Sequence, residues 1–296
     1  MKKLVWLFAL VFSGTACQPQ VPGTQVAAVA PLATSKAKPQ VQAPEQPLPT
    51  SFEAADTLTA PMRELLHQQD LSKLWQSNVE DRRANPTLEG FFGPDHYRFA
   101  LVLSEVVRDS QHPELYRVRG KCRYRKNIRP FTGTLTVRQV LELKYPYFLQ
   151  AMATNESTAA DTVTARMYTA RAQLQFQEER QDNSGIFEAE ALLDFYVVPP
   201  AKIDYVTSLV DGIDENTPTR GCGLLLRGKR RNATTRVVKD FVVASWANAA
   251  APDIYKDFMI GERSGEINPK YAKLGWNELW ENDEWWAKSP TPSLNL

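Results

Sequence analysis

Residues 163–198, VTARMYTARAQLQFQEERQDNSGIFEAEALLDFYVV, decide the fold of this chain. Apolar and polar side chains alternate with a period of two on both sides of residues 182–185 (DNSG), whose composition is typical of a tight turn. The stretch therefore predicts two antiparallel strands joined in a hairpin. A register that pairs Gln181 with Ile186 places the apolar residues of both strands on one face and the polar residues on the other.

The same alternation continues on both sides of this hairpin and predicts a second one. Pairing Tyr124 with Phe131 again gathers the apolar residues of two strands on one face. The approximate strand spans are 96–109, 115–126, 130–144, 163–180, 186–198, 202–208, 222–231 and 235–247. The strands follow one another through short turns, so the expected fold is mainly β, an antiparallel meander of about eight strands. Closure into a barrel is favoured, and a sandwich stays open as the alternative.

Short helices are expected before the strands, and an irregular segment after them. Apolar residues at helical spacing predict one or two short helices within residues 52–95. The antiparallel β domain then covers residues 96–250. Residues 251–296 are rich in Trp and carry no strand pattern, although Pro269 is suited to start a short helix that ends at Gly275. This C-terminal segment is expected to pack on the β domain.

The N-terminus has the pattern of a secretory signal peptide. Lys2 and Lys3 give it a positive start, an apolar run covers residues 4–12, and small residues lead up to Cys17. The tetrapeptide GTAC, which ends at Cys17, resembles the lipobox of bacterial lipoproteins. The resemblance implies that residues 1–16 are removed and that a lipid is attached to Cys17. An ordinary signal peptide with an incidental cysteine is the alternative.

The residues that follow form a linker. Between residues 18 and 51 the chain has seven Pro, six Gln and no aromatic residue, so this segment cannot build a core. A Pro-rich chain of this length is a semi-extended spacer. Residues 17–51 are therefore expected to tether an exported domain to a membrane. The expected location is the bacterial cell envelope, with the lipid anchor in the outer membrane.

Composition and motifs favour a binding protein over an enzyme. The formal net charge is +1, which argues against nucleic acid as a partner. The chain has three histidines, none in pairs at metal-ligand spacing, so neither a metal site nor a cofactor is expected. No nucleophile elbow or phosphate-binding glycine loop occurs either.

Five cations alternate along one predicted strand, which places them on one face. They are Arg117, Arg119, Lys121, Arg123 and Arg125. Lys126 and Arg129 extend this series, and a second cluster lies at Arg227, Lys229, Arg230 and Arg231. If the two clusters meet, they would form a surface that attracts anions, for example lipid phosphates or acidic glycans. The alternative is a solvated strand face balanced by acids, which are available at Glu188, Glu190 and Asp194 on a predicted polar face.

Two cysteines remain besides Cys17. Cys122 and Cys222 both fall on predicted apolar faces, and an exported protein is in a compartment that permits disulfides. A bond between them would close a loop of about 100 residues and stabilise the fold by several kcal/mol. Two separate buried thiols are equally compatible with the pattern.

Several segments together resemble the uncharacterised calycin-like lipoproteins of the Bacteroidota. They are residues 90–97 (GFFGPDHY), 116–129, 187–198 and 267–271 (INPKY), with Gly275-Trp276. The resemblance covers about residues 90 to 280 and implies an antiparallel barrel and a cell-envelope location, with no catalytic residue to carry over. The expected function is a non-enzymatic binding domain for an apolar or anionic envelope ligand. The alternatives are a structural or assembly component that docks to envelope proteins, and, less favoured, a glycan-active hydrolase.

Overall fold

The computed structural model describes part of the chain. The described residues are 48–49, 51–52, 57–79, 86–143, 165–180, 182–198, 202–206, 217–260, 266–279 and 284–287. The predicted signal peptide and the lipid attachment at Cys17 lie outside these residues and stay predictions. Within the described part, no helix is both long and apolar enough to cross a membrane.

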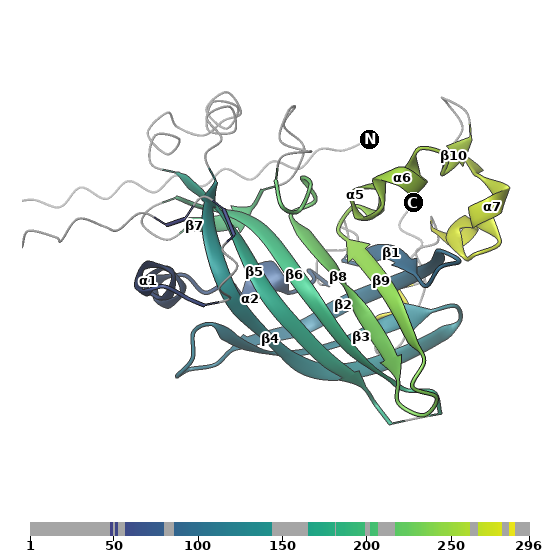
Figure 1. The fold of residues 1–296 in the computed structure, drawn as a ribbon, viewed down its shortest axis with the longest axis horizontal. Helices are drawn as coiled ribbons and strands as arrows, with labels where there is room; N and C mark the ends of the chain where they lie inside the picture. The colour runs from purple at the N-terminus through teal and green to yellow at the C-terminus, as the bar shows by residue number, and fades with distance from the viewer. Residues whose placement is uncertain are drawn as a thin grey trace, which may run out of the picture. The chain divides into compact units, whose positions relative to one another are not determined.

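Nine strands form one antiparallel sheet in the described residues (Figure 1). They are β1 (Leu88–Phe92), β2 (Tyr97–Arg108), β3 (Leu115–Tyr124), β4 (Asn127–Leu143), β5 (Arg166–Glu178), β6 (Gly185–Val198), β7 (Lys202–Tyr205), β8 (Leu224–Asn232) and β9 (Val238–Ala244). Their order is β5-β4-β3-β2-β1-β9-β8-β6-β7, and β5 also pairs with β6, so the sheet closes into a ring. The predicted mainly-β antiparallel meander is confirmed.

Strand β1 was not predicted, because Leu88–Phe92 falls in the segment expected to be helical. It pairs with β2 on one side and β9 on the other, and so connects the first half of the meander to its last strand. All five of its residues are buried. Phe92 packs in the interior of the ring and Phe91 in a separate cluster under the C-terminal segment. A strand buried on both faces shows no alternation, which explains why the sequence pattern missed it.

The β3–β4 hairpin forms, but with a different register from the predicted one. Tyr124 pairs with Asn127 in place of Phe131, a difference of four residues. The chain reverses at Arg125, whose φ of 57° lies in the left-handed region that tight hairpin turns require. Strand β4 therefore begins earlier than expected.

The β5–β6 hairpin has the same kind of offset. Ile186 pairs with Gln177 in place of Gln181, again four residues away. Phe176 consequently lies opposite Phe187. Because the offset is an even number, every side chain keeps its predicted face, and the apolar residues still point into the ring.

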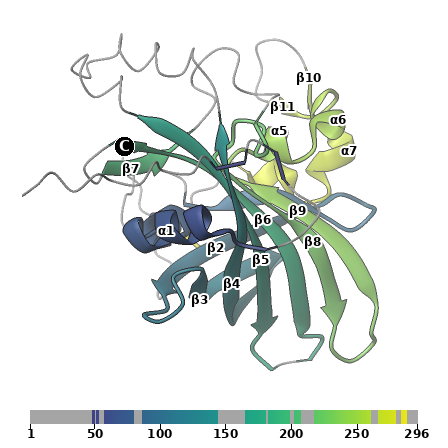
Figure 2. The same cartoon turned by 60° about the vertical axis from the view of Figure 1, so that its left-hand side comes forward.

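Aromatic side chains fill much of the ring interior. Five phenylalanines belong to its main apolar cluster and are at most 2% exposed: Phe99, Phe131, Phe176, Phe187 and Phe195. Figure 2 shows how β2, β3 and β4 curve round toward β5, β6 and β8. The interior is therefore packed for most of its length, as in small barrels.

Two short helices precede the strands, as predicted, and they close one end of the ring. They are α1 (Ala60–Gln68), which has Pro61 in its first turn, and α2 (Ser72–Trp75). Leu66 and Trp75 are fully buried in the same cluster as the ring interior. The tyrosine hydroxyl of Tyr205 donates to the carbonyl of Leu74 and ties α2 to β7.

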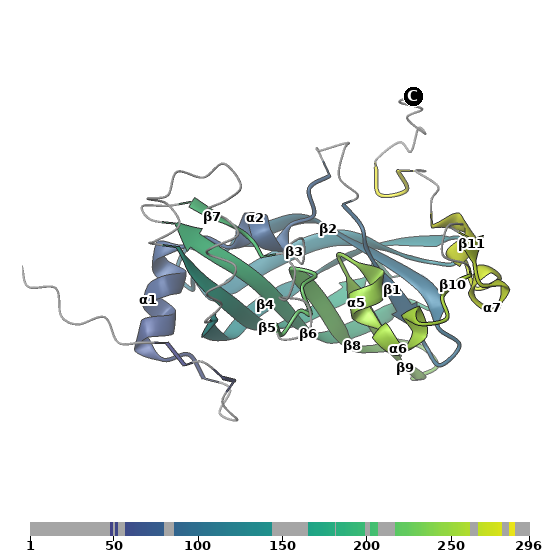
Figure 3. The same cartoon turned by 90° about the horizontal axis from the view of Figure 1, so that it is seen from above.

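The C-terminal segment covers part of the outer face of the ring, and Figure 3 shows it on the side remote from α1. Its elements are α5 (Ala247–Ala250), α6 (Pro252–Tyr255), β10 (Met259–Ile260), β11 (Glu266–Ile267), α7 (Pro269–Ala272) and η1 (Trp276–Glu278). The helix at Pro269 is confirmed, but it ends before Gly275. The β10–β11 pair corrects the expectation of no strand here. Trp276 is fully buried against Phe91, so this indole caps the sheet.

Candidate functional site

A pocket of about 370 Å³ opens at the end of the ring opposite α1 and α2. Its lining comes from β1, β2, β3, β4, β5, β8 and β9 and from the turns between them. The apolar part of the lining is Phe92, Phe99, Cys122, Tyr124 and Val237, and the charged part is Arg129, Glu178, Arg230 and Lys239. The site is thus a mouth with an aromatic wall and a mainly cationic set of polar groups.

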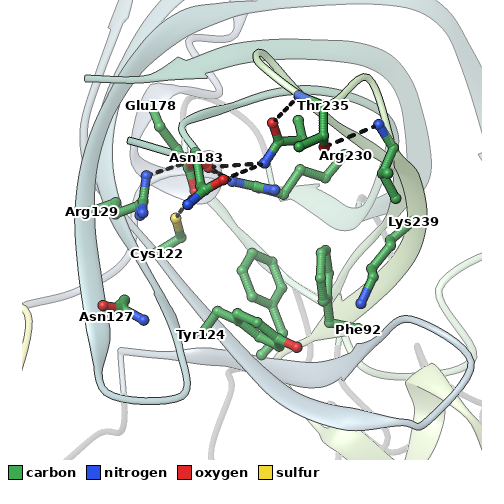
Figure 4. A pocket seen from close by; sticks show the side chains of 13 residues that line it. Phe92, Cys122, Tyr124, Asn127, Arg129, Glu178, Asn183, Arg230, Thr235 and Lys239 are labelled. Atoms are coloured by element: carbon green, nitrogen blue, oxygen red, sulfur yellow. Dashed lines mark hydrogen bonds and ion pairs between the residues drawn. The ribbon is translucent and has the colours of Figure 1, made fainter. Parts of the chain in front are cut away.

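Glu178 organises one wall of this pocket (Figure 4). Its side chain is only 4% exposed, and its Oε2 accepts from the backbone N–H of Gly185 at 2.6 Å and from Arg230 Nη2 at 2.8 Å. The thiol of Cys122 donates to Oε1 at 3.4 Å, and Arg129 Nη1 lies 3.6 Å from Oε2. Both carboxylate oxygens are therefore engaged within the wall itself.

Two arginines flank this carboxylate and are held by backbone as well. Arg129 Nη2 donates to the carbonyl of Asp182 at 2.9 Å, and Arg230 Nη2 to the carbonyl of Asn183 at 2.5 Å. Both carbonyls belong to the β5–β6 turn, so the turn and the guanidinium groups fix each other. The geometry of this wall is consequently set without any ligand.

The opposite side of the pocket carries Lys239 and aromatic rings (Figure 4). The Nζ atom of Lys239 lies 5.7 Å from the centroid of the Phe92 ring. The Phe92 ring packs on Tyr124 and Phe99, with centroids 4.7 Å and 5.5 Å away. An apolar group that enters the mouth thus meets ring faces, with cations on both sides.

Comparison of the chain with protein families, with curated proteins and with solved structures gives no match. What the site binds must therefore follow from its own residues.

The predicted site residues on β3 lie outside this pocket. Arg117 and Arg119 are exposed on the outer face, where Arg119 Nη1 is 3.6 Å from Glu105 Oε2. A carboxylate from the neighbouring strand thus balances part of the charge. Anion binding by this face stays a prediction.

The rest of the predicted cationic face is partly covered. Lys121 Nζ donates to the carbonyl of Ala287 at 2.8 Å, and the Arg123 guanidinium lies 5.2 Å from the centroid of Trp285. Arg125 stands in the β3–β4 turn, and its guanidinium packs on Tyr97 at 4.8 Å. These three cations hold the C-terminal segment and the turn, so the five residues do not form one free surface.

The cations that enter the pocket are Arg129, Arg230 and Lys239. Sequence analysis named the first two within its two cationic clusters but did not place them inside the ring, and it did not name Lys239, although a signal for the inward direction existed. Inward residues of β4 include Phe131, so the same alternation places Arg129 inward. On β8 the inward Leu226 likewise implies that Arg230 points inward. Charged residues that continue an inward series at the end of a strand are the pattern that finds this site.

The two remaining cysteines do not form a disulfide. Both are free and buried, Cys122 inside the ring and Cys222 in a cluster on its outer face with Leu192, Leu225 and Ala244. Burial raises the pKa of Cys222 to about 12, with the carboxylate of Asp194 contributing. Burial, and then Glu178, raises the pKa of Cys122 well above its usual value.

We expect neither thiol to react with N-ethylmaleimide at pH 8 in the folded protein, because the reactive thiolate form is suppressed. Both should react fully in denaturant without a reductant. Mass spectrometry of the labelled peptides measures each site separately. Modification of either cysteine in the native protein, or an unlabelled Cys122–Cys222 pair after denaturation, would contradict this assignment.

The expectation that Asp194 lies on a solvated polar face is wrong. The side chain is fully buried and accepts hydrogen bonds from the hydroxyls of Thr169 and Thr219. Burial raises its pKa, although these hydrogen bonds act in the opposite direction. Residues 217–223 cover this part of β6, and Asp194 anchors them there. Among the described residues, no group of His, Cys, Asp and Glu is arranged to hold a metal ion.

Proposed function

We propose that this chain is a membrane-tethered protein of the bacterial cell envelope that binds a small ligand in the mouth of its β ring. The observation that carries the proposal is the pocket of about 370 Å³ at the end that α1 and α2 leave open. The rest of the interior is filled by aliphatic and aromatic side chains. Pockets with apolar walls and a few convergent polar groups are the usual form of small-molecule sites.

The arrangement of polar groups favours binding over catalysis. A general acid or base needs a proton-transfer position that faces the substrate. Both oxygens of Glu178, the pocket carboxylate, are already engaged by donors from the wall. Glu178 thus acts as the fixed counter-charge of Arg129 and Arg230.

The tether belongs to the same proposal. The signal-peptide pattern, Cys17 and the Pro-rich linker support a domain held near a membrane but free to move over it. A ligand taken from the envelope or its surroundings would then reach the mouth without the chain leaving the membrane.

Native mass spectrometry of the full chain, purified from an exporting host in mild detergent, tests ligand binding. We expect a stoichiometric small molecule to accompany the protein. Val237 lines the mouth and is 54% exposed, so Val237→Trp should block the pocket without disturbing the core. Its neighbour Val238, 51% exposed and outside the lining, provides the matched control Val238→Trp. The bound mass should disappear in the first variant only.

A second candidate is docking to an envelope protein. Three aliphatic side chains near the mouth are exposed: Ile128, Val237 and Val238. Exposed apolar side chains at the rim of a pocket favour a partner surface if the partner covers them together. Cross-linking in the envelope tests it. A specific protein adduct lost in both tryptophan variants, together with a bare protein mass, would favour this candidate over ligand binding.

A further inference from the structure

We infer that the ligand of the mouth pocket is a compact amphipathic anion, whose carboxylate or phosphate group is held by the pocket cations and whose apolar part lies on the aromatic wall. This inference rests on the proposed function and names the chemical class of ligand. It concerns three cations, Arg129, Arg230 and Lys239, and two rings, Phe92 and Tyr124.

The first argument is the charge of the lining. Among the described residues of the lining, three cations face a single carboxylate, Glu178. The same carboxylate pairs with both arginines, so it does not neutralise the lysine. The pocket therefore has an excess of positive charge inside a partly desolvated mouth, where an anion is attracted more strongly than in water.

The second argument is a buried donor without an acceptor. Arg129 Nη1 is inaccessible to solvent and has no hydrogen-bond partner among the described residues. Its nearest carboxylate oxygen, on Glu178, is 3.6 Å away, which is an ion-pair distance but too long for a hydrogen bond. Buried polar groups are nearly always satisfied. The Arg129 guanidinium group therefore keeps one donor that the wall does not use, and an anionic oxygen would supply its acceptor.

The third argument is Lys239. Within the described residues, no carboxylate lies within 4.0 Å of its Nζ, which instead sits over the Phe92 ring. It enters the pocket from the side opposite Arg129 (Figure 4). An anionic head in the mouth would therefore give Lys239 a charge partner that the described part of the protein does not supply.

The apolar part of the ligand follows from the walls and the volume. Phe92, Phe99 and Tyr124 contribute aromatic rings to the lining, which suit an aromatic body or a short acyl chain. A volume of about 370 Å³ is at the small end of ligand pockets. It suits a molecule with a single ring system or a single chain, and is too small for a two-chain lipid.

Two fluorescent probes with the same ring system distinguish the contribution of an anionic head group to affinity from that of the apolar body. 8-Anilinonaphthalene-1-sulfonate carries an anion, whereas N-phenyl-1-naphthylamine is its neutral counterpart. We expect one equivalent of the anionic probe to bind the folded full chain at least about tenfold more tightly than the neutral one, the value of one charge-assisted hydrogen bond. Decanoate and decyl phosphate should displace it more effectively than decanol.

Matched variants assign the head group to the pocket. Lys239→Met should weaken binding of the anionic probe about tenfold and change the affinity for the neutral probe less than about twofold. Lys229→Met removes the same charge from an exposed position on β8 that lies outside the lining, and should change neither. Arg129→Gln and the exposed Arg117→Gln form a second pair with the same expectation. Val237→Trp should abolish the binding of both probes.

The outcomes distinguish the two proposals. Equal affinity for both probes, lost in Val237→Trp, would overturn the anionic ligand and leave the binding pocket in place. Loss of anion binding in Arg117→Gln but not in Arg129→Gln would move the anion site to the outer face of β3 and also overturn the inference. If neither probe nor any of the three alkyl compounds binds, the proposed function itself fails.

Discussion

Replacing Glu89 by Gln should destabilise the folded chain by about 3–5 kcal/mol, the usual cost of removing one partner from a buried ion pair. Arg98 Nε and Nη2 each donate to one oxygen of Glu89 at 2.9 Å. Both side chains are only 7% exposed, because the C-terminal segment covers this part of β1 and β2. The variant leaves a guanidinium group buried without its carboxylate.

Urea unfolding of the two proteins measures this loss, and the control is a pair of the same chemistry on the surface. Glu190 accepts from Arg227 Nε at 2.7 Å, but the two side chains are 31% and 58% exposed. Glu190→Gln should therefore cost less than about 1 kcal/mol. If both variants lost the same stability, burial would not be the reason for the effect of Glu89.

Phe187→Ala should have an effect of similar size, about 3–5 kcal/mol, because it opens a cavity at the centre of the ring. The Phe187 ring is fully buried and stacks on Phe176, with centroids 4.3 Å apart and an interplanar angle of 12°. It also packs against Phe99 and Phe241, at 5.8 Å and 5.4 Å. These rings come from four strands, so their contacts hold the two sides of the ring together.

Denaturant unfolding followed by tryptophan fluorescence gives the stability of this variant. Phe187→Leu keeps most of the volume and should cost clearly less, and Val238→Ala at an exposed position should stay within about 0.5 kcal/mol. If Phe187→Ala lost no more stability than Val238→Ala, the interior would not be packed as described.

The losses of stability in Glu89→Gln and Phe187→Ala have different consequences for the proposed function. Phe99 belongs to the central cluster and also lines the pocket, so the packed interior is the floor of the mouth. The Glu89–Arg98 pair is on the outer face and does not touch the pocket. We therefore expect Glu89→Gln to bind the anionic probe normally under conditions where it remains folded.

Sequence determined which residues form the strands of the ring and which side chains point inward, except at β1. The short β10–β11 pair outside the ring was also not predicted. Alternation with a period of two is a local property, and it located eight strands to within a few residues. It failed for Leu88–Phe92 because that strand is covered on both faces, by the ring interior and by the C-terminal segment. The polar residue Asp194 was misplaced for a related reason, since residues 217–223 cover it from a distant part of the chain.

Register, ring closure and the pocket were decided by the tertiary structure. Shifting a hairpin by an even number of residues leaves the same faces buried, so the pattern could not separate the pairing of Tyr124 with Asn127 from that with Phe131. Closure depends on strands far apart in sequence, such as β1 and β9. Alternation implied that Arg129 and Arg230 point inward, but only closure brought them to one mouth with Lys239. A local pattern fixes the side to which a residue points, whereas its neighbours there are set by long-range pairing.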